Sequence, residues 1–183
     1  SAQEQKKLLQ NYQVYNTYSL VKELIEESCE KFRVEKDSYE ITGDLSCEIV
    51  ASKDALKIVI DNLVDNAVKY STQQAKIVTS IISNSKKVII LFTDFGIGIV
   101  ANEQKKIFNK FYRIYSKEIP NVKGTGLGLY RVKEIIKAHG GKITVSSEGG
   151  VKGTTFKIEM PEYKTIIKRR LKKLLKNDKQ SQV

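Results

Sequence analysis

The sequence predicts an α+β fold, a two-layer sandwich with helices packed on one face of a mixed sheet. Strand-like segments come in adjacent pairs, at 77–82 with 88–92 and at 142–146 with 154–160, and long helical segments lie between the pairs. This segregation is typical of α+β domains, whereas a doubly wound fold alternates strand and helix regularly. With 183 residues, 40% of them hydrophobic, the chain has the size and composition of one domain with short extensions.

Helices are expected where apolar residues recur every three to five positions. The segments with this spacing are 20–32, 53–70 after an N-capping Ser52, and 127–138 before Gly140-Gly141. A shorter helix is expected at 102–107, and the stretch 113–123, which contains Pro120, is expected to be a loop.

Strands are expected where short β-branched and aromatic runs are bounded by turn residues. Besides the two pairs above, short strands are predicted at 39–42 and 48–50, around the turn Gly43-Asp44. The pair 77–82 and 88–92 is joined by the polar turn 83–86, and the last pair by the turn 148–150.

Most of the net charge of +11 lies at the C-terminus, because residues 164–183 hold eight basic residues and one acidic residue. Nucleic-acid binding would therefore rest on this tail alone, and it is not expected. The tail interleaves Ile and Leu with the basic residues, which predicts a basic amphipathic helix that docks on the domain or on an acidic surface, a membrane or a partner.

Membrane and disulfide classes are disfavoured by the rest of the sequence. The longest aliphatic and aromatic run is Val88–Phe92, far below the roughly 20 residues that span a bilayer. Cys29 and Cys47 form no CxxC pair and have no histidine at metal spacing, so we expect two reduced thiols. These features predict a soluble, cytoplasmic domain, with membrane contact only through the rest of a longer parent protein.

Four polar or aromatic residues share one face of the helix that ends near Tyr70. They are Asn62, Asn66, Lys69 and Tyr70, spaced 4, 3 and 1 apart. Amide oxygens can ligate Mg²⁺, a lysine neutralises phosphate, and a tyrosine ring can stack on a base. A merely polar helix face is the alternative.

An aspartate followed by two glycines, Asp94-Phe95-Gly96-Ile97-Gly98, comes directly after a predicted strand. The glycines let a ligand approach closely, and the carboxylate can accept a hydrogen bond from an adenine amino group. A plain turn is the alternative. The dinucleotide pattern G-x-G-x-x-A also fits here, but no βαβ unit surrounds it. The DFG of eukaryotic protein kinases is rejected, because no HRD loop precedes it.

A glycine-rich loop opens the helix at 127–138. Its residues are Gly124, Thr125, Gly126, Leu127, Gly128 and Leu129. Backbone N–H groups there can wrap a phosphate at the helix N-terminus, although no P-loop lysine follows. Upstream, Lys110, Arg113 and Lys123 can reach phosphates if 113–123 closes as a lid, with Phe108 and Phe111 anchoring its base.

In this order and spacing, the elements resemble the N, G1, F and G2 boxes of sensor histidine kinases. The boxes correspond to Asn62…Tyr70, Asp94…Gly98, Phe108…Arg113 and Gly124…Gly128. Ala138-His139-Gly140-Gly141 and Gly153-Thr154-Thr155-Phe156 also look like that family, and the resemblance covers about 18–161. It implies a Bergerat-type ATP-binding fold with a mobile ATP lid at 113–123.

The resemblance also implies the residue roles. Asn66 would be the main Mg²⁺ ligand with Asn62 assisting, Asp94 would read the adenine amino group, and Tyr70 would line the adenine pocket. ATP would also contact the residues Gly96, Gly98, Lys110, Tyr112 and the loop 124–129. Catalysis would be positioning and charge neutralisation by Asn62, Lys69 and Arg113.

Two departures refine this interpretation. Related ATPases of the gyrase, Hsp90 and MutL kinds have a water-activating glutamate where this chain has Asn62, so slow ATP hydrolysis is expected. The family's phosphoacceptor histidine has no counterpart, because the only histidine, His139, matches a structural position. The chain should therefore not phosphorylate itself.

The domain organisation expected from this resemblance has three parts. Residues 1–17 would be a linker from upstream dimerisation and phosphoacceptor helices, 18–161 the catalytic domain, and 162–183 the basic tail. The partners would be that upstream histidine domain and, indirectly, a response regulator. A related regulatory module, similar to anti-sigma-factor kinases, is the alternative function.

Overall fold

The computed structural model describes residues 11–84, 86–115, 122, 124–149 and 152–170. Parts of three expected regions lie outside these ranges: residues 1–10 of the linker, 116–121 and 123 of the lid, and 171–183 of the tail. No helix in the described ranges is long and apolar enough to cross a membrane.

The centre of the fold is a five-stranded mixed sheet. Its strands run in the order β2 (Tyr39–Gly43), β4 (Ile77–Ser83), β5 (Lys87–Asp94), β7 (Thr154–Pro161) and β6 (Lys142–Ser146). Strand β2 pairs with β4 in parallel, and the other three pairs are antiparallel. The predicted mixed sheet is confirmed.

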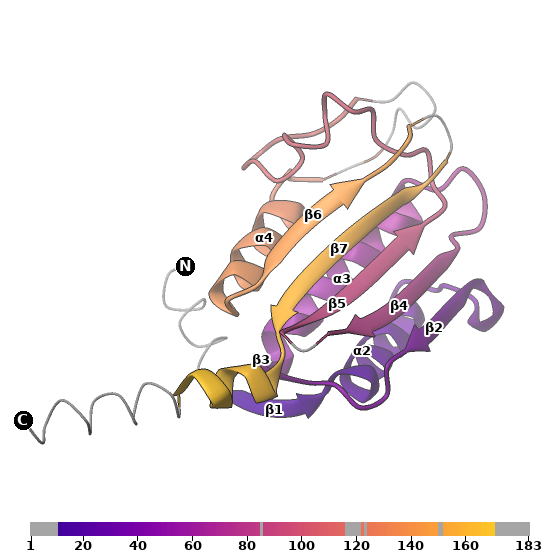
Figure 1. The fold of residues 1–183 in the computed structure, drawn as a ribbon. Helices are drawn as coiled ribbons and strands as arrows, with labels where there is room; N and C mark the ends of the chain where they lie inside the picture. Colours follow the sequence, from indigo (N-terminus) through magenta and orange to yellow (C-terminus); the bar gives the residue numbers. More distant parts are fainter. Residues whose placement is uncertain (1–10, 85, 116–121, 123, 150–151, 171–183) are drawn as a thin grey trace, which may run out of the picture.

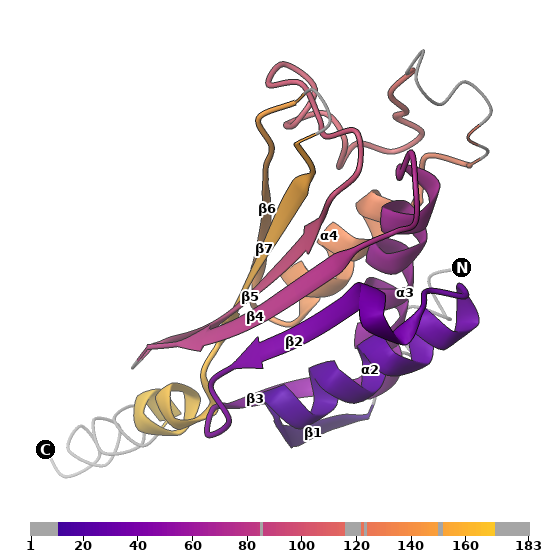
Figure 2. The ribbon, with the colours of Figure 1, turned by 90° about the vertical axis from the view of Figure 1, so that its right-hand side faces the viewer.

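Three helices cover one face of this sheet, as Figure 2 shows edge-on. They are α2 (Thr17–Lys31), α3 (Lys53–Lys69) and α4 (Gly128–Ala138). Asn16 caps α2 by accepting from Ser19 N at 2.9 Å, and Ser52 caps α3 as predicted. The α+β prediction with helices on one face is confirmed.

The core lies between the helices and the sheet. Buried and less buried side chains alternate along the strands, and the buried ones point into this core. On β5 the buried residues are Val88, Ile90, Phe92 and Asp94. Because side chains alternate between the faces of a strand, Asp94 is the last helix-facing residue of β5. The register therefore places one carboxylate at the end of an otherwise apolar row.

Strand β1 (Tyr12–Asn16) was not expected. It pairs antiparallel with β3 (Glu48–Ser52) in a separate two-stranded sheet, with Val14 opposite Val50. Tyr12–Asn16 thus belongs to the fold rather than to the expected linker. The segment lacks an alternating pattern of its own, and only the long-range pairing makes it a strand.

The short strands predicted on either side of Gly43-Asp44 are confirmed, and they belong to different sheets, because β2 joins the large sheet and β3 the small one. One further expectation needs correction. The segment 102–107 forms successive turns instead of a helix; Lys106 N, for example, donates to Glu103 O at 2.8 Å. Side-chain contacts hold it: the Gln104 amide donates to Ile99 O at 3.0 Å and to Ser147 O at 2.6 Å.

Candidate functional site

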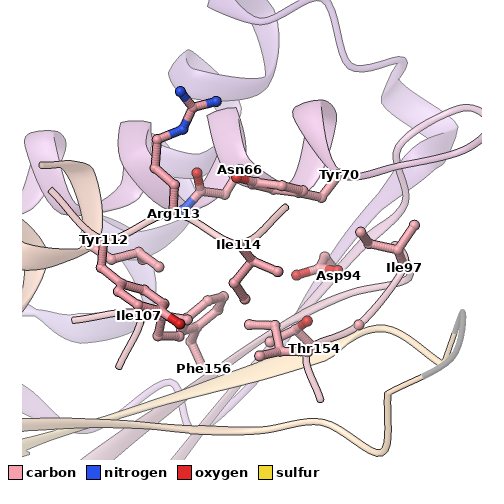
Figure 3. Close-up of a pocket in the computed structure, with 13 residues that line it drawn as sticks. Asn66, Tyr70, Asp94, Ile97, Ile107, Tyr112, Arg113, Ile114, Thr154 and Phe156 are labelled. Carbon is pink, nitrogen blue, oxygen red and sulfur yellow. The ribbon is translucent and has the colours of Figure 1, made fainter. Parts of the chain in front are cut away.

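Two adjoining cavities lie where the loops after β5, before α4 and before β7 meet the C-terminal half of α3. Figure 3 shows the residues that line the first of them. Both cavities open to solvent, and the empty space they span measures about 610 and about 640 Å³. Both are lined by the same six residues, namely Asn66, Tyr70, Ile107, Tyr112, Arg113 and Leu129. Because the cavities share these walls, they act as one site with two ends.

The first end is apolar and has one carboxylate at its base. Its walls include Ile97, Ile99, Ile114 and Phe156, and the Asp94 side chain faces this space in Figure 3. Asp94 is only 5% exposed, and this burial raises the pKa of its carboxyl to about 6. Hydrogen bonds from the backbone of Gly96 (3.0 Å) and Thr154 act in the opposite direction. A flat apolar ligand with one hydrogen-bond donor fits such an end.

The loop that carries Asp94 is fastened to the end of α3. Ile97 N donates to Tyr70 O at 3.0 Å, and a β-carbon at Gly96 would lie 2.5 Å from that carbonyl oxygen. Gly153, with φ +73°, packs against the backbone of Asp94, where a β-carbon on Gly153 would lie 2.1 Å from Asp94 O. The glycines are therefore required by backbone packing around the aspartate.

Ser147 supports the floor of this end, a role that no motif in the sequence indicates. Its hydroxyl accepts from Ile99 N at 2.8 Å and donates to Gly153 O at 2.7 Å. The Gln104 amide also bonds to this region. These contacts link the loop after β5 to the β6–β7 connection. No local motif could have revealed the bonds of Ser147 with Ile99 and Gln104, because these partners are more than 40 residues from it.

The second end is polar. From α3 it is lined by Asn62, Asp65, Asn66 and Lys69, and from the opposite side by Gly124, Thr125, Gly126 and Gly128. Lys69 Nζ lies 2.5 Å from Asp65 Oδ2. Asp65 was overlooked, although its spacing of four residues from Lys69 is a known signal for a helical ion pair.

Gly126 and Gly128 are shaped by close neighbours. Gly126 has φ +70°, its carbonyl accepts from Phe111 N at 2.9 Å, and a β-carbon there would lie 2.6 Å from Phe111 C. Gly128 faces the side-chain oxygen of Asn62, whose amide nitrogen donates to Ile58 O at 2.7 Å. The glycine loop therefore lies directly against the Asn62 face of α3.

Tyr112 and Arg113 stand between the two ends (Figure 3). The Tyr112 hydroxyl donates to the carboxylate of Glu103, which lies 3.1 Å from Lys106 Nζ. The Arg113 guanidinium donates to Val122 O. Arg113 is thus held near the point where the apolar and polar ends meet.

Some predicted residues lie apart from the cavities. Lys110 lines neither, and its ammonium lies 4.8 Å from the centroid of the Tyr130 ring. Gly96 and Leu127 support the loops without lining them, and Lys123 lies outside the described residues. Phe108 is buried as expected, but Phe111 is 71% exposed, so it does not anchor the lid base through a buried ring.

His139 is placed far from this chemistry. It is buried, Ser52 N donates to its Nε2 at 3.1 Å, and its Nδ1 lies 2.8 Å from Ile135 O. These contacts require a neutral ring with the proton on Nδ1. Burial lowers its pKa, which favours the same form. His139 joins the C-terminus of α4 to the N-terminus of α3.

The donor set indicates which metal the polar end can hold. In the described part of the chain, no group of three or more His, Cys, Asp or Glu side chains could hold a metal ion. A site for zinc or another thiophilic metal therefore does not fit there. The amide oxygens of Asn62 and Asn66 fit a hard cation whose other ligands come from phosphate and water.

Known proteins agree with this geometry. The profile of the family "Histidine kinase-, DNA gyrase B-, and HSP90-like ATPase" matches residues 51–164. Sensor protein RprX of Bacteroides fragilis is 39% identical over 151 residues, which are 80% of this chain and 27% of RprX. Sensor protein SrrB of Staphylococcus aureus is 38% identical over 109 residues, which are 60% of this chain and 18% of SrrB.

A solved structure, the nucleotide-free catalytic domain of histidine kinase ThkA, superposes with a TM-score of 0.66 at 27% identity. The match covers 83% of this chain and 96% of that domain.

The chain belongs to the histidine kinase-, gyrase B- and Hsp90-like ATPase family. Within it, the chain is a catalytic domain of the sensor histidine kinase kind, as the resemblance of its four boxes implied. It spans about a quarter of the length of RprX and less than a fifth of SrrB.

Proposed function

We propose that this domain binds Mg²⁺-ATP and transfers the γ-phosphoryl group to a histidine on a separate domain of a sensor kinase, which then supplies a response regulator. One observation carries the proposal: an apolar cavity with a single buried carboxylate continues into a polar cavity lined by amides, a lysine and a glycine loop. Adenine and triphosphate need these two environments in this order.

At the apolar end, Asp94 supplies the specificity. Its carboxylate accepts a hydrogen bond from the adenine amino group, and guanine presents a carbonyl oxygen at that position, which the carboxylate repels. Ile97, Ile114 and Phe156 cover the faces of the base, and the ring of Tyr70 closes the side toward α3.

At the polar end, the residues of the chain position the phosphates. Gly124–Gly128 present backbone N–H groups at the N-terminus of α4, where the helix dipole favours anions. Lys69 and Arg113 neutralise phosphate oxygens, and Lys69 exchanges part of its contact with Asp65 for the ligand. Asn66 and Asn62 would hold Mg²⁺, which when bound neutralises charge on the phosphate oxygens.

The absence of a base at position 62 supports transfer rather than hydrolysis. Asn62 is an amide that cannot activate water, and its side chain is already oriented by the bond to Ile58 O. The acceptor must lie on another domain, because His139, the only histidine of the chain, is buried in structural contacts. The γ-phosphoryl group would pass to that imidazole nitrogen, with ADP as the leaving group.

Calorimetry with a non-hydrolysable ATP analogue tests the binding step, and GTP is the control. We expect Mg²⁺-dependent binding of the ATP analogue and much weaker binding of GTP. Radiolabelled ATP then tests transfer, with a histidine-bearing helical domain from a sensor kinase supplied in trans. Acid-labile label on that domain, and none on this chain, is the expected result. Absence of ATP-analogue binding with and without Mg²⁺ contradicts the proposal.

A further inference from the structure

Two polar side chains, Ser147 and Gln104, line neither cavity but lie directly beside the apolar end of the site. Ser147 follows β6, and Gln104 belongs to the turns after β5. Both β5 and β6 run antiparallel to β7, so they end on the same side of the sheet, as Figure 1 shows. The two side chains can therefore reach the backbone that forms the walls of this end.

The Ser147 hydroxyl uses its whole hydrogen-bonding capacity on the backbone around it. It accepts from Ile99 N at 2.8 Å and from Gly149 N at 3.2 Å. It donates to Gly153 O at 2.7 Å. A hydroxyl has one proton to donate and two lone pairs that accept, so nothing is left for a ligand. Ser147 can act on a bound nucleotide only through the segments that it holds.

The Gln104 amide holds the same residue of the loop by its other backbone atom. Gln104 Nε2 donates to Ile99 O at 3.0 Å and to Ser147 O at 2.6 Å. Both partners are carbonyl oxygens, which only accept, so both protons of this nitrogen are engaged. Two side chains thus bind the N–H and the C=O of Ile99, a residue that lines the apolar cavity.

The opposite wall of this end begins at the start of β7, with Gly153 and Thr154. Gly153 N donates to Gly96 O at 3.1 Å. The backbone of Thr154 bonds to the Asp94 carboxylate. Because Gly153 O is the group that accepts from Ser147, this one hydroxyl joins the loop after β5 to the first residues of β7.

We propose that Ser147 and Gln104 are positioning residues for adenine recognition. By bracing the two walls, they fix the width of the apolar end and keep water away from the Asp94 carboxyl. This inference rests on the proposed function, because it names what holds the base end of that site in shape. Without the brace, Ile99 N and Gly153 O turn to water, and the loop that carries Asp94 gains freedom.

Calorimetry with adenosine measures the effect at the base end alone, since adenosine carries no phosphate. Ser147→Ala should weaken adenosine binding by about 10-fold, the equivalent of about one hydrogen bond. The ATP analogue should lose affinity by the same factor, because the phosphate end is untouched. Ser146→Ala is the matched control: it removes the same hydroxyl from the exposed neighbouring residue and should leave the affinity unchanged.

Gln104→Glu tests the second brace without a change of shape. A carboxylate there cannot donate and faces two carbonyl oxygens, so adenosine binding at about pH 7.5 should again fall by about 10-fold. Asn102→Asp is the matched control, because it makes the same change of charge at an exposed position two residues away. Adenosine is uncharged, so the added charge has no direct effect on it.

The pH profile of adenosine binding separates positioning from a mere loss of stability. In the parent, the affinity should fall as Asp94, with a pKa of about 6, becomes protonated. Once water reaches the carboxyl, its pKa falls toward the ordinary value of 3.8, and the midpoint of the profile should move to about pH 5. The other ionisable residues that line this cavity are Tyr70, Tyr112 and Arg113, of types that do not titrate between about pH 5 and pH 7.

The outcomes distinguish this inference from the proposed function. If the parent binds adenosine, but Ser147→Ala and Gln104→Glu keep its affinity and its midpoint, the inference is overturned and the proposed function stands. Losses of equal size in the controls would overturn it as well. A parent that binds neither adenosine nor the ATP analogue would overturn both. Thermal unfolding of each variant is measured alongside, and if Ser147→Ala does not fold, the isosteric Gln104→Glu decides.

Discussion

Gly128 and Asn62 are in direct contact across the polar end of the site: a β-carbon on Gly128 would lie 2.5 Å from Asn62 Oδ1. The first residue of α4 and the middle of α3 therefore meet at a point where no side chain fits. The amide of Asn62 is held from behind by Ile58 O, so it has little freedom to withdraw. This contact fixes the distance between the glycine loop and the asparagine face.

The first prediction follows from this contact. Gly128→Ala should push the Asn62 amide aside and weaken Mg²⁺-dependent binding of an ATP analogue by about 10-fold, the equivalent of about one displaced hydrogen bond. Gly124→Ala is the matched control, because nothing lies within 4 Å of its β-carbon position. Calorimetry on the two variants measures the difference. Equal affinities would show that this contact does not matter for binding.

The second prediction separates stability from binding at Asp94. Its carboxyl has a pKa of about 6 instead of 3.8, so holding it ionised near neutral pH destabilises the folded state by about 3 kcal/mol. Asp94→Asn removes this charge and should raise the free energy of unfolding by about 1–3 kcal/mol near pH 8, while ATP-analogue affinity falls at least ~100-fold. Urea unfolding and calorimetry on the same protein give both values. Lower stability together with unchanged affinity would refute the assigned role.

The third prediction concerns the pH dependence of binding. A carboxylate that accepts from the adenine amino group must be ionised, and protonation of Asp94 competes with the ligand as the pH falls through about 6. Affinity should therefore drop between about pH 7 and pH 5, and binding below pH 6 should release a proton. Adenosine, which has no phosphate that titrates in this range, isolates the effect. In Asp94→Asn the pH dependence for adenosine should vanish; its persistence would place the titrating group elsewhere.

The fourth prediction concerns His139. Burial lowers its pKa in the folded protein, so its contribution to stability is complete above the unfolded pKa of about 6.5 and decreases as the pH falls below that value. Asp94 acts in the opposite direction, because its raised pKa makes the folded state gain stability as the pH falls from about 6 toward 4. The comparison is therefore best made in the Asp94→Asn background.

In that background, the free energy of unfolding should decline between about pH 7.5 and pH 5. His139→Gln should remove part of this decline and should destabilise the domain by about 2 kcal/mol near pH 8, through loss of the ring's contacts with Ser52 and Ile135. Urea titrations across the pH range provide the measurement. Identical pH profiles with and without His139 would contradict the neutral, buried ring.

Much of the fold could be predicted from local sequence patterns. The N-cap at Ser52, the apolar spacing within α3 and the alternation along β5 each determine their element over a few residues. Strand β1 could not be predicted from the sequence, because Tyr12–Asn16 becomes a strand only by pairing with residues more than 30 positions away. The segment 102–107 was wrongly predicted to be a helix because its turns are held by the bond of the Gln104 amide to Ser147 O, which lies 43 residues away in the sequence.

The sequence by itself determined which polar side chains belong to the site and which of them share a face of a helix or strand. The helical period brought Asn62, Asn66 and Lys69 to one face, and the strand period placed Asp94 in line with Val88, Ile90 and Phe92. These are short-range properties that the backbone geometry imposes wherever the segment lies.

Only the tertiary structure decided how the pieces meet. It buried Asp94 deeply enough to raise its pKa, brought Gly128 against Asn62, and left Lys110 outside both cavities. It also linked Ser147 to the loop after β5. Desolvation and close packing arise from residues far apart in the chain, so no local pattern specifies them.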